Sequence, residues 1–252
     1  MSKTKSRHRH SAFVRFLPNM VTLGALCIGL TAIRFAMEED MFRAVSLLLL
    51  AGFLDGIDGR MARFLHCSSE FGAQLDSLVD FVNFGVVPGF IIYVWVNSMT
   101  DIKGFDWALV LTFSISMALR LARFNVALDK TAVNKTIDKY FFQGIPSPCA
   151  AAMAMLPLVL SFQFGEDYFY ANPTVVLFYT FTLAILAIST TPTISIKKIP
   201  VRNKYVYLTL TILGLIIFGL IVEPWLTLAA VGITYLFSIP VTIFFYFKIK
   251  YC

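Results

Sequence analysis

The chain has 252 residues, of which 58% are hydrophobic, 15% aromatic and 14% charged, and its mean hydropathy is +0.76. A soluble domain carries about 25% charged and 45–50% apolar residues. The composition therefore excludes a water-soluble globule, and it also excludes a disordered chain, a coiled coil and a disulfide scaffold. Because a membrane-spanning helix needs about 20 residues, we expect an all-α polytopic membrane bundle that forms a single domain over residues 1–252.

Eight apolar stretches predict eight transmembrane helices. In chain order they are 18–37, 41–65, 71–97, 105–128, 145–164, 172–189, 205–222 and 224–247. Residues 1–17 form a basic segment before the first stretch, with no small-residue cleavage site after it, so we expect the first helix to remain as a span. The segment 205–252 holds two helices in which we place no motif.

Basic charge alternates between the connections. Of the 21 Lys and Arg residues, 18 lie in the termini and in every second connection, and the opposite side holds only Arg34, Arg43 and Lys103. The positive-inside rule then places both termini in the cytoplasm of a multi-pass protein of the cell membrane. The net charge is +6. We expect the basic residues to face anionic lipid headgroups, and we expect no nucleic acid as partner.

Four aspartates lie where the second and third predicted helices meet. Asp55 and Asp58 are three residues apart and Asp76 and Asp80 are four apart, so each pair shares one helix face. A short connection makes the two helices antiparallel neighbours, so the four carboxylates can converge near the cytoplasmic surface. Carboxylates this close repel one another unless cations neutralise them, and all-carboxylate sites suit Mg²⁺ or Mn²⁺. Two such cations can clamp the attacking and leaving oxygens of a phosphoryl displacement.

A purely structural interpretation is the alternative. Small residues near the acids would then only allow close helix packing, and the acids would pair with Arg60 and Arg63. Those two arginines balance only two of the four negative charges, which favours the metal site.

The spacing of these residues resembles a known signature. The pattern D-x2-D-G-x2-A-R-x8-G-x3-D-x3-D, typical of the CDP-alcohol phosphotransferases, is matched by Asp55, Asp58, Gly59, Ala62, Arg63, Gly72, Asp76 and Asp80. The resemblance implies a membrane enzyme that moves a phosphatidyl or similar group from a CDP-linked donor to an alcohol and releases CMP. It also implies a homodimer, which agrees with the commonest oligomeric symmetry.

The resemblance assigns roles to particular residues. Asp55, Asp58 and Asp76 would be metal ligands, and Asp80 would be the general base that also touches one metal. Contacts to the CDP-linked donor are implied for signature residues and for three polar residues outside the signature: Gly59, Ala62, Arg63, Gly72, Asn19, Thr22 and Ser69. Asn19 and Thr22 match a P-N-x-x-T pattern, and the alternative is that they cap the first helix.

Three further stretches bear on the acceptor alcohol. Segments 120–125, 142–148 and 189–197 resemble the membrane-bound phosphatidylserine synthases of bacteria and archaea, and the likeness extends over roughly residues 11–200. This implies CDP-diacylglycerol as donor and L-serine as acceptor. Arg120 and Arg123 could hold the serine carboxylate, or they could be interfacial anchors.

Two other functions stay open. A sister transferase would take glycerol 3-phosphate or inositol phosphate as acceptor, and extra basic residues around the acceptor pocket would favour it. A cation transporter would use the same acids, but it predicts acids near the middle of the membrane rather than at helix ends.

Overall fold

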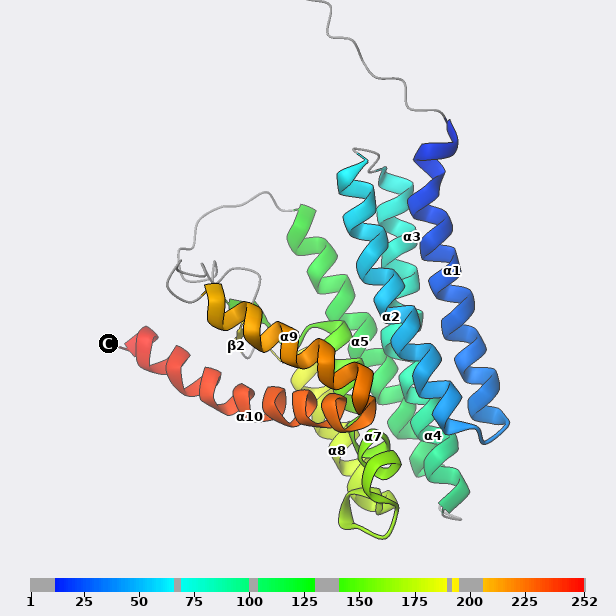
Figure 1. Ribbon diagram of the computed structural model, residues 1–252, viewed down its shortest axis with the longest axis vertical. Helices are drawn as coiled ribbons and strands as arrows, with labels where there is room; N and C mark the ends of the chain where they lie inside the picture. Colours follow the sequence, from blue (N-terminus) through cyan, green and yellow to red (C-terminus); the bar gives the residue numbers. More distant parts are fainter. Residues whose placement is uncertain are drawn as a thin grey trace, which may run out of the picture.

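The computed structural model describes residues 12–65, 69–99, 104–129, 141–189, 192–194 and 206–251. Helices make up nearly all of this part of the chain (Figure 1). They are α1 (Ala12–Met37), α2 (Met41–Phe64), α3 (Glu70–Phe81), the π-helix η1 (Val82–Val86), α4 (Val87–Met99), α5 (Phe105–Asp129), α6 (Ser147–Ala154), α7 (Leu156–Phe164), the 3₁₀-helix η2 (Phe169–Ala171), α8 (Pro173–Ile188), α9 (Val206–Val222) and α10 (Pro224–Tyr251). The all-α fold class is confirmed.

One short antiparallel ladder is an addition to the expected helices. Strand β1 (Phe141–Gln143) pairs with β2 (Pro192–Ile194), with Phe142 opposite Thr193. Each strand has three residues, so the ladder joins the connection before α6 to the one after α8 without forming a layer of its own.

The helices follow the predicted apolar stretches closely. The third stretch is one continuous helical segment, Glu70–Met99, made of α3, η1 and α4. The fifth stretch breaks at Met155 between α6 and α7, two residues before Pro157, where proline removes a backbone donor.

Five helical segments of the described chain are long and apolar enough to cross a membrane. These are Phe16–Met37, Glu70–Met99, Asp106–Val126, Ser147–Phe164 and Pro224–Phe244. Helices α8 and α9 are apolar but shorter, and the charged residues of α2 other than Arg43 lie in its C-terminal half. The protein is thus a multi-pass helical membrane protein, whereas eight spans and cytoplasmic termini stay predictions.

Helices α1, α2 and α3 lie side by side (Figure 1). A tight turn joins α1 to α2: Glu39 has a positive φ of 62°, and the Asp40 carboxylate caps α2 by accepting from the Arg43 N–H at 3.0 Å. Ser69 caps the start of α3, because its Oγ accepts from the Gly72 N–H at 3.0 Å. The end of α2 and the start of α3 are therefore fixed at the same end of the bundle.

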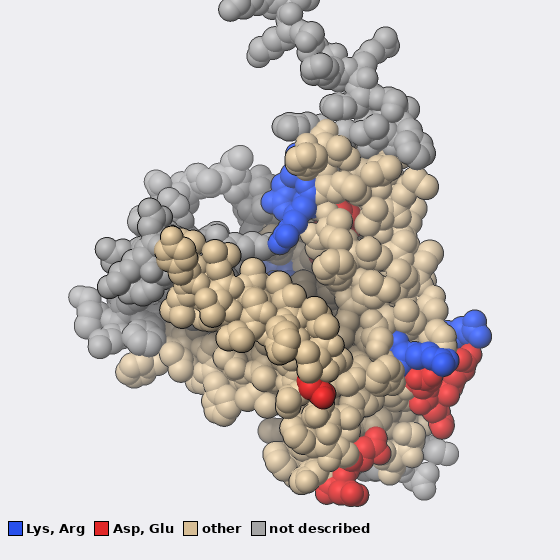
Figure 2. All heavy atoms as spheres, viewed as in Figure 1, with Lys and Arg blue, Asp and Glu red and all other residues tan. Residues whose placement is uncertain are grey.

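Charge is unequally distributed along the long axis. Figure 2 shows acidic side chains gathered toward the lower end of the view. The described residues form two ion pairs, Arg34–Glu38 at 3.0 Å and Arg43–Asp40 at 3.3 Å. Both lie around the α1–α2 turn, at the end of α2 opposite to the start of α3.

The apolar core lies among α4, α5 and α6–α8, with Ile91, Phe113 and Leu158 fully buried. Helix α9 buries no side chain and forms a hairpin with α10 that crosses the other helices in Figure 1. An apolar helix without buried residues suits contact with lipid.

Candidate active site

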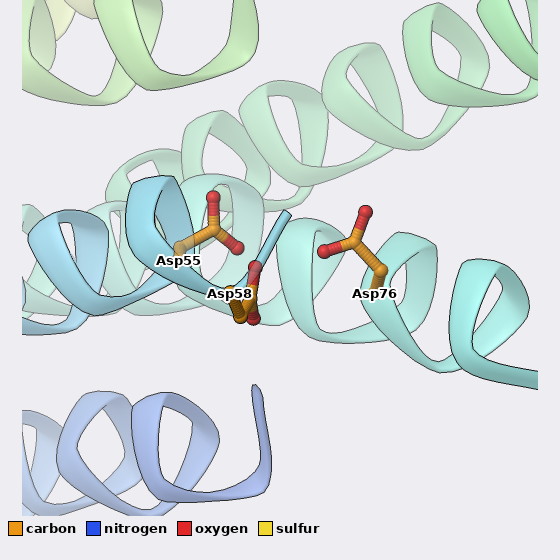
Figure 3. A group of neighbouring side chains, drawn as sticks. All are labelled: Asp55, Asp58 and Asp76. Carbon is orange, nitrogen blue, oxygen red and sulfur yellow. The ribbon is translucent and has the colours of Figure 1, made fainter. Parts of the chain in front are cut away.

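Three carboxylates converge between α2 and α3. One oxygen each from Asp55, Asp58 and Asp76 lies within 4.8 Å of the others, and Figure 3 shows the three side chains directed toward a common space. Asp58 is only 2% exposed, and the other two are half-buried. The structure thus brings together three of the four predicted metal ligands.

Two oxygens of this triad lack partners. Asp55 Oδ1 and Asp58 Oδ1 are buried and accept no hydrogen bond from any described residue. A buried carboxylate oxygen without a partner is costly and rare. Hard divalent cations bind such oxygens, so the triad fits the expected kind of cation.

Asp80 lies beside the triad rather than in it. It follows Asp76 by one turn of α3, is half-buried, and its carboxyl group lies at hydrogen-bonding distance from that of Asp55. The guanidinium of Arg120 on α5 attracts the Asp80 carboxylate through space. The fourth aspartate therefore lies next to the triad.

Thr22 of α1 binds a triad member directly. Its buried Oγ1 lies 2.6 Å from Asp58 Oδ2 and 3.0 Å from the Pro18 carbonyl, and one hydroxyl proton can serve only one of these acceptors at a time. Donation to Oδ2 orients Asp58 and leaves its Oδ1 for a ligand. The sequence predicted that Thr22 contacts the CDP-linked donor. In the structure Thr22 instead binds the Asp58 carboxylate.

Asn19, Ser69 and Gly72 meet where α1 approaches α3. A β-carbon on Gly72 would come within 2.9 Å of Asn19 Oδ1 and 3.1 Å of Ser69 Oγ. Glycine is therefore needed here for helix packing, and Ser69 caps α3. Their predicted contacts with the CDP-linked donor stay predictions.

Gly59 and Arg63 lie on the exposed side of the end of α2. Arg63 Nε donates to the Gly59 carbonyl at 2.9 Å, and a β-carbon on Gly59 would meet no atom within 4 Å. A helical glycine costs about 1 kcal/mol relative to alanine, and nothing in the described protein requires it here. The side chain of Ala62 lies outside the described part, and no ion pair among the described residues joins Arg60 or Arg63 to an aspartate.

Arg120 and Arg123 bind main-chain carbonyl groups. Arg120 is 9% exposed and its Nε donates to the Ile145 carbonyl at 2.5 Å. Arg123 donates to the carbonyls of Ile188 at 2.7 Å and Ser189 at 3.2 Å. These contacts tie α5 to the start of α6 and the end of α8, and the role of both arginines in binding serine stays a prediction.

A cavity of about 220 Å³ opens between α3 and α5 beside the aspartates. Ser77 and Asn125 line it, and Asn125 Nδ2 donates to Ser77 Oγ at 3.1 Å. Neither residue was predicted from the sequence to be part of the site. Their signals were present, because Ser77 directly follows Asp76 and Asn125 ends the segment 120–125.

Residues 15–193 match the family model described as CDP-alcohol phosphatidyltransferase. The chain belongs to this family. A second model, described as CDP-alcohol phosphatidyltransferase 2, matches residues 204–240, which include α9 and the first part of α10. We placed no motif in the last two helices from the sequence, but α9 and the first part of α10 match this second family model.

Members of this family in several bacteria are similar over most of the chain. A CDP-diacylglycerol–serine O-phosphatidyltransferase of Mycobacterium leprae is 34% identical over 240 residues, covering 95% of this chain and 78% of the relative. Enzymes of the same name from Helicobacter pylori and Bacillus subtilis are 33% identical over 201 residues and 32% identical over 176 residues. These cover 79% and 70% of this chain, and 80% and 88% of the relatives.

Proposed function

We propose that this protein is a CDP-diacylglycerol–serine O-phosphatidyltransferase. The serine hydroxyl oxygen attacks the phosphorus that carries the diacylglycerol, the bond from that phosphorus to the CMP oxygen breaks, and phosphatidylserine and CMP form. The names of the bacterial relatives support this activity. The single observation that carries it is the aspartate triad with two buried, unpartnered oxygens.

Asp55, Asp58, Asp76 and Asp80 are proposed to hold two divalent cations, Mg²⁺ or Mn²⁺. When bound, these cations supply positive charge that neutralises the diphosphate of the donor. The triad consists of carboxylates alone. Thr22 orients one of them, Asp58, through its hydrogen bond. The fourth residue, Asp80, reaches this site through its contact with Asp55.

Asp80 is proposed to accept the proton of the serine hydroxyl. It is the aspartate that lies outside the three-carboxylate group, and together with Asp76 it lines the cavity between α3 and α5. A general base must lie within hydrogen-bonding reach of the proton that it removes. A carboxylate between the triad and a small cavity is suitably placed for this role.

The nucleotide and diphosphate are proposed to bind over Gly59 and Arg63, at the exposed end of α2, where no described atom fills the space above the glycine. The acyl chains would remain in the bilayer. We further propose that the chain is one domain, that it is a homodimer in the cell membrane, and that its site faces the cytoplasm. The basic connections support this orientation.

Purified protein supplied with CDP-diacylglycerol and Mn²⁺ tests the acceptor. We expect CMP release with L-serine and at least tenfold slower release with glycerol 3-phosphate or inositol phosphate. Comparable or faster release with either phosphate would assign the protein to a sister transferase. Divalent cation flux into liposomes without CMP release would instead indicate a transporter, although the acids lie in the C-terminal half of α2 and the N-terminal half of the segment Glu70–Met99.

A further inference from the structure

Helix α3 directs two different faces toward its neighbours. Asp76 converges with the two aspartates of α2, and Asp80 interacts with one of them, Asp55 (Figure 3). Ser77 lies on the face toward α5, where its Oγ accepts from Asn125 Nδ2 at 3.1 Å. The aspartate site therefore exists only while α3 keeps its acids toward α2 and Ser77 toward α5.

The same two neighbours contact η1 and α4 further along the segment Glu70–Met99. A β-carbon on Gly85 or on Gly89 would come within 3.0 Å and 3.2 Å, respectively, of side-chain atoms of α5. Both glycines therefore pack closely against α5. Phe84 lies against α2 instead, because its ring is 3.3 Å from the place that a β-carbon on Gly52 would take.

An uninterrupted α-helix could not make both sets of contacts. An α-helix turns about 100° per residue, so the step from Ser77 to Gly89 would turn roughly 1,200°, which is about 120° beyond three full turns. The π-helix changes this, because the Val87 N–H donates to the Val82 carbonyl, five residues back, and the turn holds about one extra residue. That residue removes about 100° of rotation and returns Gly89 to the face that carries Ser77.

Two side chains fix η1 against the neighbouring helices. Ser114 of α5 donates from its Oγ to the Gly85 carbonyl at 3.2 Å. On the side of α1, Asn83 is fully buried in the space that Gly29 leaves. Neither polar atom of the Asn83 side chain has a hydrogen-bond partner among the described residues, and a buried amide without partners is costly. The packing of η1, rather than hydrogen bonding of Asn83, therefore imposes this conformation.

We propose that η1 sets the rotation of α3 about its axis so that Asp76 and Asp80 point toward α2, and that Ser114 is a positioning residue for both. In this role Ser114 acts through the Gly85 carbonyl and touches neither cation nor substrate. This inference rests on the proposed metal site. Loss of the extra residue would rotate α3 by about 100° relative to α4 and carry both carboxylates away from α2.

Deletion of Val86, a half-buried residue of η1, tests the rotation. The deletion removes the extra residue, whereas Val86→Ala shortens the side chain and keeps the residue count. Electron paramagnetic resonance measures Mn²⁺ binding to the purified protein without substrates. We expect the Mn²⁺ dissociation constant to rise about 100-fold or more in the deletion variant and less than about threefold in Val86→Ala. A folded deletion variant that binds Mn²⁺ as tightly as the wild type would overturn the role of η1.

Ser114→Ala decides the question if the deletion variant does not fold. Ser114 is half-buried and alanine favours a helix, so this variant should fold. We expect its Mn²⁺ dissociation constant to rise about tenfold, the lower end of the range for groups that orient metal ligands. Ser116→Ala is the matched control, because Ser116 lies on the same helix and donates to the Thr112 carbonyl.

The control separates positioning from a general loss of stability. Both serine variants should lower the thermal unfolding temperature by similar amounts, and only Ser114→Ala should weaken Mn²⁺ binding. Wild-type Mn²⁺ affinity in Ser114→Ala, or equal weakening in Ser116→Ala, would overturn the role of Ser114. A wild-type protein that binds no Mn²⁺ would overturn the proposed metal site itself, which is a separate outcome from normal wild-type binding with unaffected variants.

Discussion

Asp76 and Asp80 lie one turn apart on α3 but have different neighbours. Asp76 is part of the three-carboxylate group, whereas Asp80 lies outside that group and interacts with Asp55. A ligand that holds cations acts before the reaction, and a general base acts only when the hydroxyl gives up its proton. Substitution should therefore separate the two roles.

Asp76→Asn should weaken both Mn²⁺ binding and CDP-diacylglycerol binding together with turnover. Asp80→Asn should lower turnover about 10²- to 10⁴-fold, the usual contribution of a positioned base, and largely spare donor binding. Donor affinity and serine-dependent CMP release check this in purified protein. Glu70→Gln is the control, because Glu70 is an exposed acid on the first turn of the same helix.

Normal turnover in Asp80→Asn would place the base elsewhere. Loss of Mn²⁺ and donor as severe as in Asp76→Asn would make Asp80 primarily a ligand.

The hydroxyl of Thr22 should support metal binding through Asp58. Thr22→Val keeps the shape of the side chain and removes the hydrogen bond to Asp58. Groups that orient metal ligands typically contribute 10- to 100-fold in metal affinity, so the Mn²⁺ concentration for half-maximal activity should rise by that factor. Thr22→Ser should retain most of the affinity.

Thr31→Val is the matched control, because Thr31 lies on the same helix and donates to the Cys27 carbonyl instead of an acid. An unchanged Mn²⁺ dependence in Thr22→Val would show that Thr22 does not support the site.

Single residues illustrate what sequence spacing can and cannot predict. Intervals of three and four residues place aspartates on one helix face, so their convergence could be predicted from the sequence. The contact between Ser77 and Asn125 joins residues 48 positions apart. It depends on how α3 packs against α5, which no local pattern encodes.

At the scale of elements, the π-helix η1 interrupts the segment that carries Asp76 and Asp80. Asn83 in η1 is fully buried, and neither of its polar side-chain atoms has a hydrogen-bond partner among the described residues. It packs against Gly29 of α1, where a β-carbon would overlap the Asn83 amide. π-Helical turns occur mostly as insertions at functional sites, and apolar periodicity gave no signal for this one.

Gly29→Ala should lower the thermal unfolding temperature by several degrees, because overpacking a close contact costs about 1–3 kcal/mol. Thermal unfolding in detergent measures it. The double variant Gly29→Ala with Asn83→Ala should recover most of the loss. Gly24→Ala is the control on the same helix, because its β-carbon would meet no atom within 4 Å.

Equal effects of Gly29→Ala and Gly24→Ala would contradict a close contact between α1 and η1.

At the scale of the whole molecule, the boundaries of the helices follow from hydropathy, because each span must present an apolar surface of fixed length to lipid. Hydropathy does not predict the path of the α9–α10 hairpin across the bundle, because α9 buries no side chain and its sequence is apolar throughout. The short β1–β2 ladder likewise depends on two connections that meet in space, since its paired residues Phe142 and Thr193 are 51 positions apart.

The charge distribution along the helices bears on where the aspartate site lies. The described acids of the turns, Glu38, Glu39 and Asp40, lie at the end of α1 and α2 opposite to the aspartate site. The site therefore lies toward the basic, N-terminal end of α1, where anionic donor headgroups would gather.

Transfer of the phosphatidyl group to serine should require a divalent cation at the aspartate site. Purified protein in liposomes with CDP-diacylglycerol and L-serine should release CMP, stop when EDTA is added, and recover when excess Mn²⁺ or Mg²⁺ is supplied. Asp58→Asn should remain inactive at every Mn²⁺ concentration, since it removes the charge of the most buried carboxylate of the triad. CMP release that persists in EDTA, or that survives in Asp58→Asn, would contradict metal-dependent catalysis at this site.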